Sequence, residues 1–558
     1  MHKQKKRSLL LTLAFLSVVP AIAHLAYSWM GFSPTDQGFT LAYSRRIIEG
    51  QVPHLDFIII RPPLSPLIHT PFVLFGGEYT YWLSRAFVWF QFAVIAWAWV
   101  SAADHVSGRV FGAPLKLLLG VVAFSGTAQH FVLTAWHSID GMFLASIGAW
   151  LLVTRRSTGS RFSGYLLAGA AYLTKQSFIL VAPLFLLVLG DWRRPKYLLA
   201  AAVPGLLYIA YLLASGAFPD AYAQLTSQTG ILSAGILSYL NYAVALGGVL
   251  GLALTLPLVA TGGLWLDRLP ARPGVVRGTG ALSLFGVPAA FTTLGMIVDA
   301  LSTVAFGIFG MALGAAAVML GADLYRRRRG EPTRDVGAVR FTLLALALAW
   351  SASLSFGYNT PGLGIGIMLL ALWLLAYPYL PTASAPRLAR AVLVGAGLAV
   401  ILSFAWSRTE YIYRELPAAQ LTEPASEVLP GGRLIYTNSQ TYAFLEDIGE
   451  GRRIAEERGK EYAIIPQAAG HWVQAEQPNP LPLDWPWSVE LGTPELNERV
   501  KRDLRAERGE TVVLAQKVDA FELAYDPRPA TSEQYEILRY VRENWEKTGE
   551  TKYFEIYE

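Results

Sequence analysis

The feature that most constrains the fold is a series of apolar segments of membrane-spanning character. A helix needs roughly 20 mainly apolar residues to cross the hydrocarbon core of a bilayer. About thirteen such segments occur in the first 406 residues, and the two around Lys175 are short. They lie at about 8–30, 79–103, 113–132, 138–154, 162–174, 177–190, 197–215, 238–264, 279–297, 301–321, 338–355, 361–379 and 388–406. We therefore predict a polytopic α-helical membrane protein.

The composition agrees with a bilayer environment. Only 16% of the residues are charged, whereas soluble domains average about 25%. The chain has no cysteine, which excludes a disulfide framework and a thiol nucleophile. The N-terminal MHKQKKR precedes about 23 apolar residues, and this length favours an uncleaved first helix over a signal peptide.

The loops between the segments predict the orientation, because cytoplasmic loops carry an excess of Lys and Arg. Every second loop is basic: MHKQKKR (1–7), RRSTGSR (155–161), DWRRPK (191–196), LDRLPARPGVVR (266–277), YRRRRGEPTR (325–334) and PRLAR (386–390). The opposite loops are almost free of positive charge: WHSID, TKQS, GAFPDAYAQLTSQTG, VDALS and GYNTPG. We expect a multi-pass protein of the cell membrane with a cytoplasmic N-terminus. The basic excess is then a feature of the loops, and no nucleic-acid partner is expected.

The last 150 residues form a second region with a different character. Residues 407–558 hold 28 of the 41 acidic residues and 18 of the 46 basic ones. Within them, 430–438 and 510–517 read as strands, and 495–507 and 531–547 read as helices, the latter with Thr531 or Ser532 as its N-cap. We predict two domains: a transmembrane domain at 1–406 with an outer loop at 31–78, and a soluble extracytoplasmic α/β domain at 407–558.

The outer loop begins with Asp36, which has two readings that do not exclude each other. SPTDQG is a good capping sequence, so Asp36 could cap the following helix. It could also be a general base at the membrane surface. The stretch QGFTLAYSRRIIEG after it is amphipathic, which suits a helix in the interface plane that ends at Gly50.

The middle of the same loop carries Asp56 and Arg61 in VPHLDFIIIRPPLSP. Pro62 and Pro63 prevent a helix there and impose an extended turn. Arg61 could extend to lipid headgroups, or it could bind the phosphate of a lipid substrate through two hydrogen bonds.

Two further positions on the predicted outer face combine charge with apolar surroundings. Asp140 in TAWHSIDGMFL follows His137 by three residues and could cap the next helix. The two residues could also contribute to a divalent-cation site, although two ligands are too few to define one. Lys175 in AAYLTKQSFIL interrupts an apolar run, and a buried cation there favours an anionic partner such as a phosphate.

Three stretches of this chain together resemble a known family. TDQG with LAYSRRIIEGQVPHLDF and RPPLSPLIHTP resembles the first outer loop of GT-C glycosyltransferases. The nearest group is the protein O-mannosyltransferase-like one, which includes the aminoarabinose transferases. HSIDGMFLASIGAWLLV is similar to its second outer loop, and YLLAGAAYLTKQSFILVAPLFLL to its Leu-Thr-Lys helix. The resemblance covers the first 190 residues, and beyond them only the layout matches.

The resemblance implies a GT-C-like fold and an inverting transfer of a sugar from a polyprenyl-phosphate donor. The acceptor would be a hydroxyl of a protein, lipid or glycan on the outer face. By the family pattern, Asp36 is the base, Asp140 orients the acceptor or a metal, and Arg61 and Lys175 bind the donor phosphate. Asp56, His137 and Tyr43 are secondary candidates. A divalent cation held by Asp36, Asp140 and His137 stays open, because many members have Asp-Glu where this chain has Asp36-Gln37.

Other functions remain as alternatives to the enzyme. The chain contains no P-loop, no HExxH and no GxGxxG after a strand, so no nucleotide site is expected. A transporter or a flippase for lipid-linked glycans would place ionisable groups near the bilayer midplane, whereas here they gather at one face. A membrane scaffold presenting the tail leaves Lys175 unexplained.

Three tryptophans of the tail could stack on sugar rings or serve only in packing: Trp472, Trp485 and Trp487.

Overall fold

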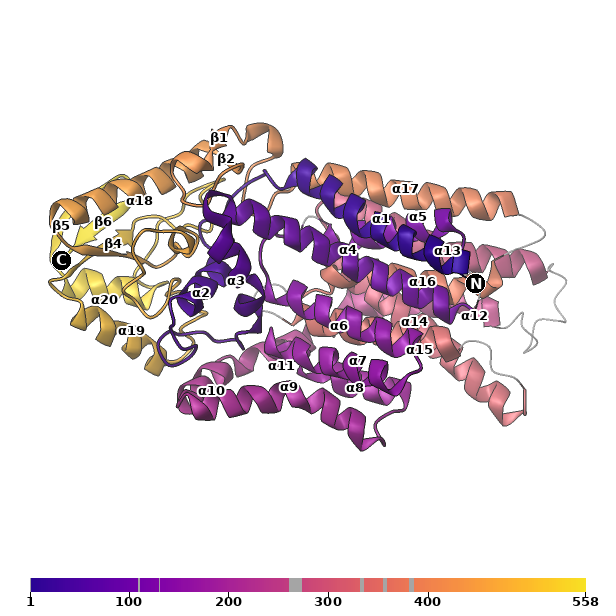
Figure 1. Cartoon of the computed structure of the whole chain (residues 1–558). Coiled ribbons are helices and arrows are strands. Elements are labelled where there is room, and N and C mark those ends of the chain that lie inside the picture. Colours follow the sequence, from indigo (N-terminus) through magenta and orange to yellow (C-terminus); the bar gives the residue numbers. More distant parts are fainter. Residues whose placement is uncertain are drawn as a thin grey trace.

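The computed structural model describes residues 2–108, 111–129, 131–259, 273–331, 336–354, 359–380 and 386–558. It shows a long helical bundle with a smaller domain of helices and strands at one end (Figure 1). The N-terminus lies at the bundle end far from this domain, and the C-terminus lies at the domain's outer tip (Figure 1). Parts of predicted segments and loops fall outside the described residues: 1, 130, 260–264, 266–272, 332–334, 355 and 357–358.

The bundle confirms the predicted polytopic helical fold. In the described part of the chain, ten helical stretches are long and apolar enough to cross a membrane, and two further apolar helices are shorter. Each of the thirteen predicted segments coincides with one bundle helix. These are α1 (His2–Tyr27), α4 (Thr80–Val106), α5 (Ala113–Ala128), α6 (His137–Thr154), α7 (Thr158–Ala170), α8 (Val181–Leu189), α9 (Pro195–Ala214), α12 (Tyr242–Val259), α13 (Pro273–Ile297), α14 (Leu301–Arg328), α15 (Val336–Ser353), α16 (Ile365–Ala376) and α17 (Pro386–Glu410).

Helices α12 and α14 pack with their backbones almost in contact. A Cβ atom on Gly247 would lie 2.0 Å from the carbonyl oxygen of Gly307, and one on Gly314 would lie 2.4 Å from that of Gly248. Between lipid tails, van der Waals packing replaces the hydrophobic effect as the force that joins helices, and small residues permit this close approach. The glycines of α12 and α14 therefore fix one rigid pair within the bundle.

Four shorter helices lie between the bundle and the C-terminal domain: α2 (Phe39–Ile48), α3 (Leu64–Gly76), α10 (Phe218–Thr226) and α11 (Thr229–Leu237). The helical prediction for the stretch after Asp36 is confirmed, and Gly50 follows its end with φ of +87°. The interfacial position predicted for α2 is wrong, because seven of its ten residues are buried. Helices α10 and α11 were not predicted; the Gln224 side chain anchors α10 by bonding to His54 and to the backbone N–H of Ile59.

The C-terminal domain is built on a four-stranded sheet, as an α/β domain should be. Strand order is β3-β4-β6-β5, with β3 and β4 parallel and the other neighbours antiparallel. Its elements are β1 (Glu423–Pro424), β2 (Tyr436–Thr437), α18 (Ser439–Glu457), β3 (Glu461–Ile465), α19 (Pro494–Ala506), β4 (Thr511–Gln516), α20 (Glu536–Asn544), β5 (Lys547–Glu550) and β6 (Phe554–Tyr557).

The sequence predictions for this domain are partly confirmed. Strand β4 and helix α19 match the predictions for 510–517 and 495–507. The strand predicted at 430–438 is reduced to the two residues of β2. Helix α20 begins after Tyr535, so neither Thr531 nor Ser532 is its N-cap.

The outer loop shares its core with the C-terminal domain. Phe39, Tyr43 and the run 57–60 are buried in one cluster with residues of β3, β4, α19 and α20. Figure 1 shows α2 and α3 at the junction of bundle and domain. Segments that are hundreds of residues apart in sequence therefore meet around this junction.

Candidate active site

A cavity of about 390 Å³ lies at the junction of the bundle and the C-terminal domain. Four of the predicted site residues line it: Asp36, Arg61, His137 and Lys175. The remainder of the wall includes residues after α17 and residues of the segment before α19. The cavity therefore needs both domains to be complete.

Asp36 is buried, and its carboxylate faces the residues that follow α17. Its Oδ2 accepts a hydrogen bond of 2.6 Å from the Tyr413 hydroxyl and lies 3.3 Å from Nη1 of Arg414. The N-cap of α2 is Gly38, and no side chain caps the helix. The capping role considered for Asp36 is therefore wrong, and its carboxylate is directed at the cavity.

The pKa of Asp36 lies above its ordinary value. Burial raises it, and Arg414, the Tyr413 hydrogen bond and Arg61 oppose this effect without cancelling it. A carboxylate with a raised pKa accepts a proton more readily than one in water, because base strength follows pKa.

Gly38 brings the start of α2 against the C-terminal domain. A Cβ atom on Gly38 would lie 2.1 Å from Cα of Gly470, so no larger residue fits without displacement. The amide of Gly470 donates to the carbonyl of Pro34 at 2.7 Å, and the Tyr81 hydroxyl donates to the carbonyl of Gly470. This contact fixes the backbone on both sides of Asp36.

Arg61 reaches the cavity from the turn before Pro62 and Pro63, as the sequence predicted for a non-helical segment. Its Nη1 pairs with Oε1 of Glu490 at 2.7 Å, and its guanidinium lies 5.7 Å from the Phe39 ring centre. Burial alone would lower the pKa of Arg61, but the charge of Glu490 holds it above the ordinary value. Arg61 is thus a permanent cation that already has an acidic partner.

Lys175 differs from Arg61 because no carboxylate pairs with it in the described part of the chain. It lies at the break between two 3₁₀ turns, Ala171–Leu173 and Gln176–Leu180, and Nζ donates to Oγ of Ser138 at 3.0 Å. Burial, and then the charge of Arg61, lower the pKa of Lys175 to about 7. A buried cation without an anion is costly, so this position suits an anionic ligand.

His137 and Asp140 lie one turn apart on α6, but only His137 reaches the cavity. The His137 ring stacks on Phe39 with centroids 5.0 Å apart. Asp140 lies outside the lining and is fully buried; Oδ1 accepts from Gln91 at 2.7 Å and lies 3.1 Å from Nε2 of His69, and Oδ2 accepts from Ser65. The capping role considered for Asp140 is wrong, because α6 has Trp136 at its N-cap and no side chain caps it.

The other two secondary candidates also lie outside the cavity lining. Tyr43 is buried on α2, and its ring centre is 5.7 Å from that of Phe57. Asp56 is exposed and accepts a hydrogen bond of 2.6 Å from the backbone N–H of Val52, which closes a local turn.

A resident metal ion finds no ligand set among the residues the structure describes. No group of three or more His, Asp or Glu side chains converges there. Asp140 has its oxygens engaged by Ser65, His69 and Gln91, so it does not join Asp36 and His137 at a shared centre.

Several lining residues were not among the site residues predicted from sequence. Tyr413 and Arg414 come directly after α17, and Glu490 comes from the segment before α19. Trp485 and Trp487, noted from sequence only as stacking candidates, also line the cavity, whereas Trp472 is buried in the domain core. The sequence signal for Glu490 is slight: one acid in the otherwise apolar and aromatic stretch WPWSVELG.

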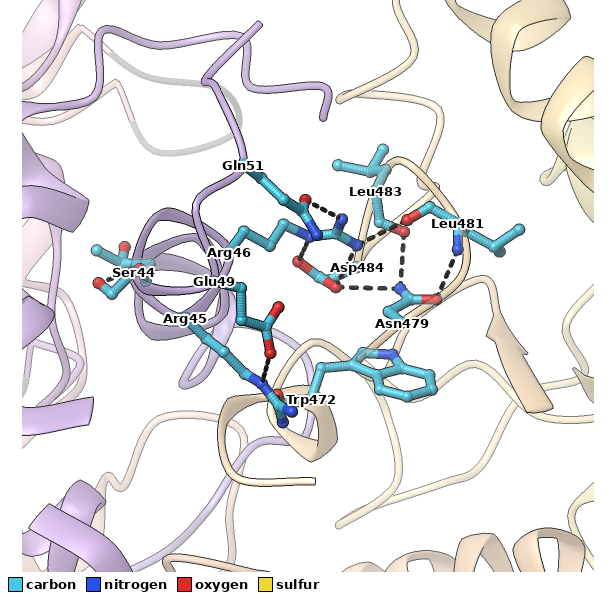
Figure 2. A network of polar contacts seen from close by, with 11 residues as sticks. Ser44, Arg45, Arg46, Glu49, Gln51, Trp472, Asn479, Leu481, Leu483 and Asp484 are labelled. Atoms are coloured by element: carbon cyan, nitrogen blue, oxygen red, sulfur yellow. Dashed lines mark hydrogen bonds and ion pairs between the residues drawn. The ribbon is translucent and has the colours of Figure 1, made fainter. Parts of the chain in front are cut away.

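A polar network holds the segment that carries these aromatic residues against α2. Figure 2 shows the Arg46 guanidinium facing the Asp484 carboxylate, with Nε–Oδ2 at 2.7 Å and Nη2–Oδ1 at 2.8 Å. Arg46 also donates to the carbonyl of Leu481, and Asn479 donates to Asp484. Because Asp484 directly precedes Trp485, this ion pair fixes the position of Trp485 in the cavity wall.

Comparison with known proteins gives one chain-wide likeness. No protein-family model matches the sequence, and no curated protein matches it. Among solved structures, the chain is similar to ArnT from Cupriavidus metallidurans bound to undecaprenyl phosphate. The two share 14% sequence identity and superimpose with a TM-score of 0.42, over 98% of this chain and 97% of the other.

Proposed function

We propose that this chain is an inverting glycosyltransferase that uses a polyprenyl-phosphate sugar as donor. One observation carries the proposal: Asp36, a buried carboxylate with a raised pKa, and Lys175, a buried cation without an acidic partner in the described residues, line the same cavity. The first suits a general base and the second suits a phosphate. The sequence resemblance to GT-C transferases names the same two positions.

The reaction follows from these two groups. The acceptor hydroxyl attacks the anomeric carbon from the side opposite the phosphate, and its proton passes to Asp36. The bond from the anomeric carbon to the phosphate oxygen breaks, and the electron pair stays on that oxygen. Lys175 stabilises the charge that develops there, because a preorganised cation acts on the leaving group without reorganisation. The products are a glycosylated acceptor of inverted configuration and polyprenyl phosphate.

The remaining predicted residues support this site in different ways. Arg61 lines the cavity beside its partner Glu490 and adds positive potential around the phosphate. Asp140 joins α3, α4 and α6 through Ser65, Gln91 and His69, so it acts as a positioning residue on the helix that carries His137. The site faces the outer side of the membrane, together with residues 31–78 and the C-terminal domain.

The experiment compares sugar transfer by wild type, Asp36→Asn and Asp56→Asn in membranes supplied with polyprenyl-phosphate sugars. Removing a general base costs about 10²–10⁴-fold in rate, so Asp36→Asn should lose transfer at unchanged expression. Asp56→Asn is the matched control, since Asp56 is an exposed carboxylate of the same loop. Equal transfer by Asp36→Asn and wild type would remove Asp36 as the base. Movement of lipid-linked sugar without transfer would instead favour the transporter or flippase alternative.

A further inference from the structure

The proposed reaction leaves one buried acid of the cavity without a role. The Glu490 side chain is fully buried and lines the cavity. Its Oε1 pairs with Arg61, whereas Oε2 has no hydrogen-bond partner among the described residues. Buried polar atoms in native proteins are nearly always hydrogen-bonded, and an unsatisfied one is destabilising. Oε2 therefore suits a hydrogen-bond donor that a ligand brings.

Two aromatic rings stand next to this carboxylate in the sequence and in the cavity wall. The Trp485 and Trp487 rings are 5.4 Å apart and inclined by 11°, so they form one stacked pair. Trp487 also lies 4.8 Å from Phe521, and Trp485 lies 5.2 Å from Phe39. These ring contacts hold the pair rigidly in the cavity wall, where it presents an apolar surface. Such a surface suits the C–H face of a sugar ring, while a few placed polar atoms read its hydroxyls.

The charged residues of the cavity suggest where each part of the donor binds: the phosphate near Lys175 and the sugar near Glu490. Lys175 is available to the donor phosphate, because no carboxylate pairs with it in the described chain. Arg61 already balances the charge of Glu490, so Glu490 needs no second cation. A neutral hydroxyl is then a better partner for Oε2 than an ammonium group.

We propose that Glu490, with Trp485 and Trp487, is the sugar-recognition wall of this enzyme, supplied by the C-terminal domain. The wall takes a neutral sugar that donates a hydroxyl hydrogen bond to Oε2 of Glu490 and stacks on the tryptophan pair. This inference rests on the proposed function and adds the substrate class to it. It also gives the C-terminal domain a direct part in donor selection.

The test measures binding to the full-length protein in nanodiscs, using undecaprenyl phosphate alone and undecaprenyl phosphate linked to neutral hexoses, neutral pentoses or an amino pentose. The decisive quantity is the ratio of affinities for the sugar-linked and the bare lipid. For Glu490→Gln, we expect this ratio to fall about tenfold or more, because any change that passes through Arg61 to the phosphate affects both lipids alike and cancels in the ratio. Trp487→Leu should lower the same ratio while the Arg61–Glu490 ion pair stays intact. Glu476→Gln is the control, because Glu476 is a largely exposed acid of the same domain.

Deoxy analogues of the preferred sugar identify the recognised hydroxyl. Wild type should lose affinity for one analogue, and Glu490→Gln should show no further loss for it. Equal loss of both lipids in Glu490→Gln would overturn the inference, since Glu490 would then act on the phosphate through Arg61. An unchanged ratio in both variants, or a preference for the amino pentose, would also overturn it. Wild type that binds both lipids equally defeats this inference alone, whereas wild type that binds neither defeats the proposed function with it.

Discussion

At the scale of single residues, the site combines two groups whose surroundings change their proton affinity. Burial raises the pKa of the Asp36 carboxyl and lowers that of the Lys175 ammonium group. The raised pKa makes Asp36 a stronger base for the acceptor proton. The lowered pKa means that the protonated form of Lys175 is favoured by a bound anionic ligand. Donor binding should therefore respond to pH through Lys175.

The pH dependence of donor binding tests this reading. The free protein holds Lys175 with a pKa of about 7, and a bound phosphodiester favours the charged form. As pH rises above this value, a growing fraction of Lys175 is neutral, so affinity should fall by up to about tenfold per pH unit. Lys175→Arg stays protonated, so its affinity should be flat from pH 7 to 9.

The measurement is the dissociation constant for a polyprenyl-phosphate sugar across this range. A phosphodiester has no titration of its own there, so the slope reports the protein. The same slope in wild type and Lys175→Arg would show that another group controls donor binding.

Sequence reasoning found some of these residues and missed others for a physical reason. Asp36, Arg61 and Lys175 stand out locally, because charge at the edge of an apolar segment is costly. Glu490 lies in a soluble domain where acids are common, so its burial beside Arg61 has only a slight local signature. Asp140 stands out as strongly as Asp36, yet it does not line the cavity, because helical spacing does not tell which neighbour a side chain meets.

At the scale of elements, the position of α2 depends on one buried ion pair. The Arg46 and Asp484 side chains are only 6% and 3% exposed and join at two points. Breaking a buried pair leaves an uncompensated charge, whereas replacing both partners by apolar residues is often neutral.

Paired substitutions should separate these two cases. Arg46→Met should destabilise the protein by about 3–5 kcal/mol, and the double variant Arg46→Met/Asp484→Leu should recover most of the loss. The measurement is the thermal unfolding of purified protein in detergent. Glu78→Gln is the matched control, because the Glu78–Arg433 pair joins the same two regions but is exposed. If Arg46→Met and Glu78→Gln shift the midpoint equally, the buried pair does not hold the junction.

Helices could be predicted from the sequence where the residues of the helix itself carry the signal. Every predicted apolar segment coincides with a helix, since about 20 apolar residues in a row have few alternatives in a bilayer. Helix α2 was predicted as a helix but misplaced, because an amphipathic pattern fits a membrane surface and a protein surface equally well. Its burial follows from Asp484, Leu481 and Gly470, which are more than 400 residues away.

At the scale of the whole molecule, the two ends of the bundle should face opposite sides of the membrane. The basic loop at 155–161 and the C-terminal domain belong to different ends, and the native chain has no cysteine to interfere with labelling. In intact cells, Glu543→Cys on the exposed face of α20 should react with an impermeant maleimide. Arg156→Cys should react only after permeabilisation. Labelling of both in intact cells, or the reverse pattern, would contradict the orientation.

The cavity draws its walls from residues 36, 61, 175, 414 and 490, and this order has a consequence for biosynthesis. A ribosome delivers the proposed base and phosphate-binding residue to the membrane long before it has made the segment from Trp485 to Glu490. The part of the cavity wall that comes from the C-terminal domain is therefore still missing when these residues have been made. On the orientation that the loop charges predict, the cavity closes only after the C-terminal domain has crossed the bilayer and packed against α2, so translocation of that domain would be the step that completes the proposed active site.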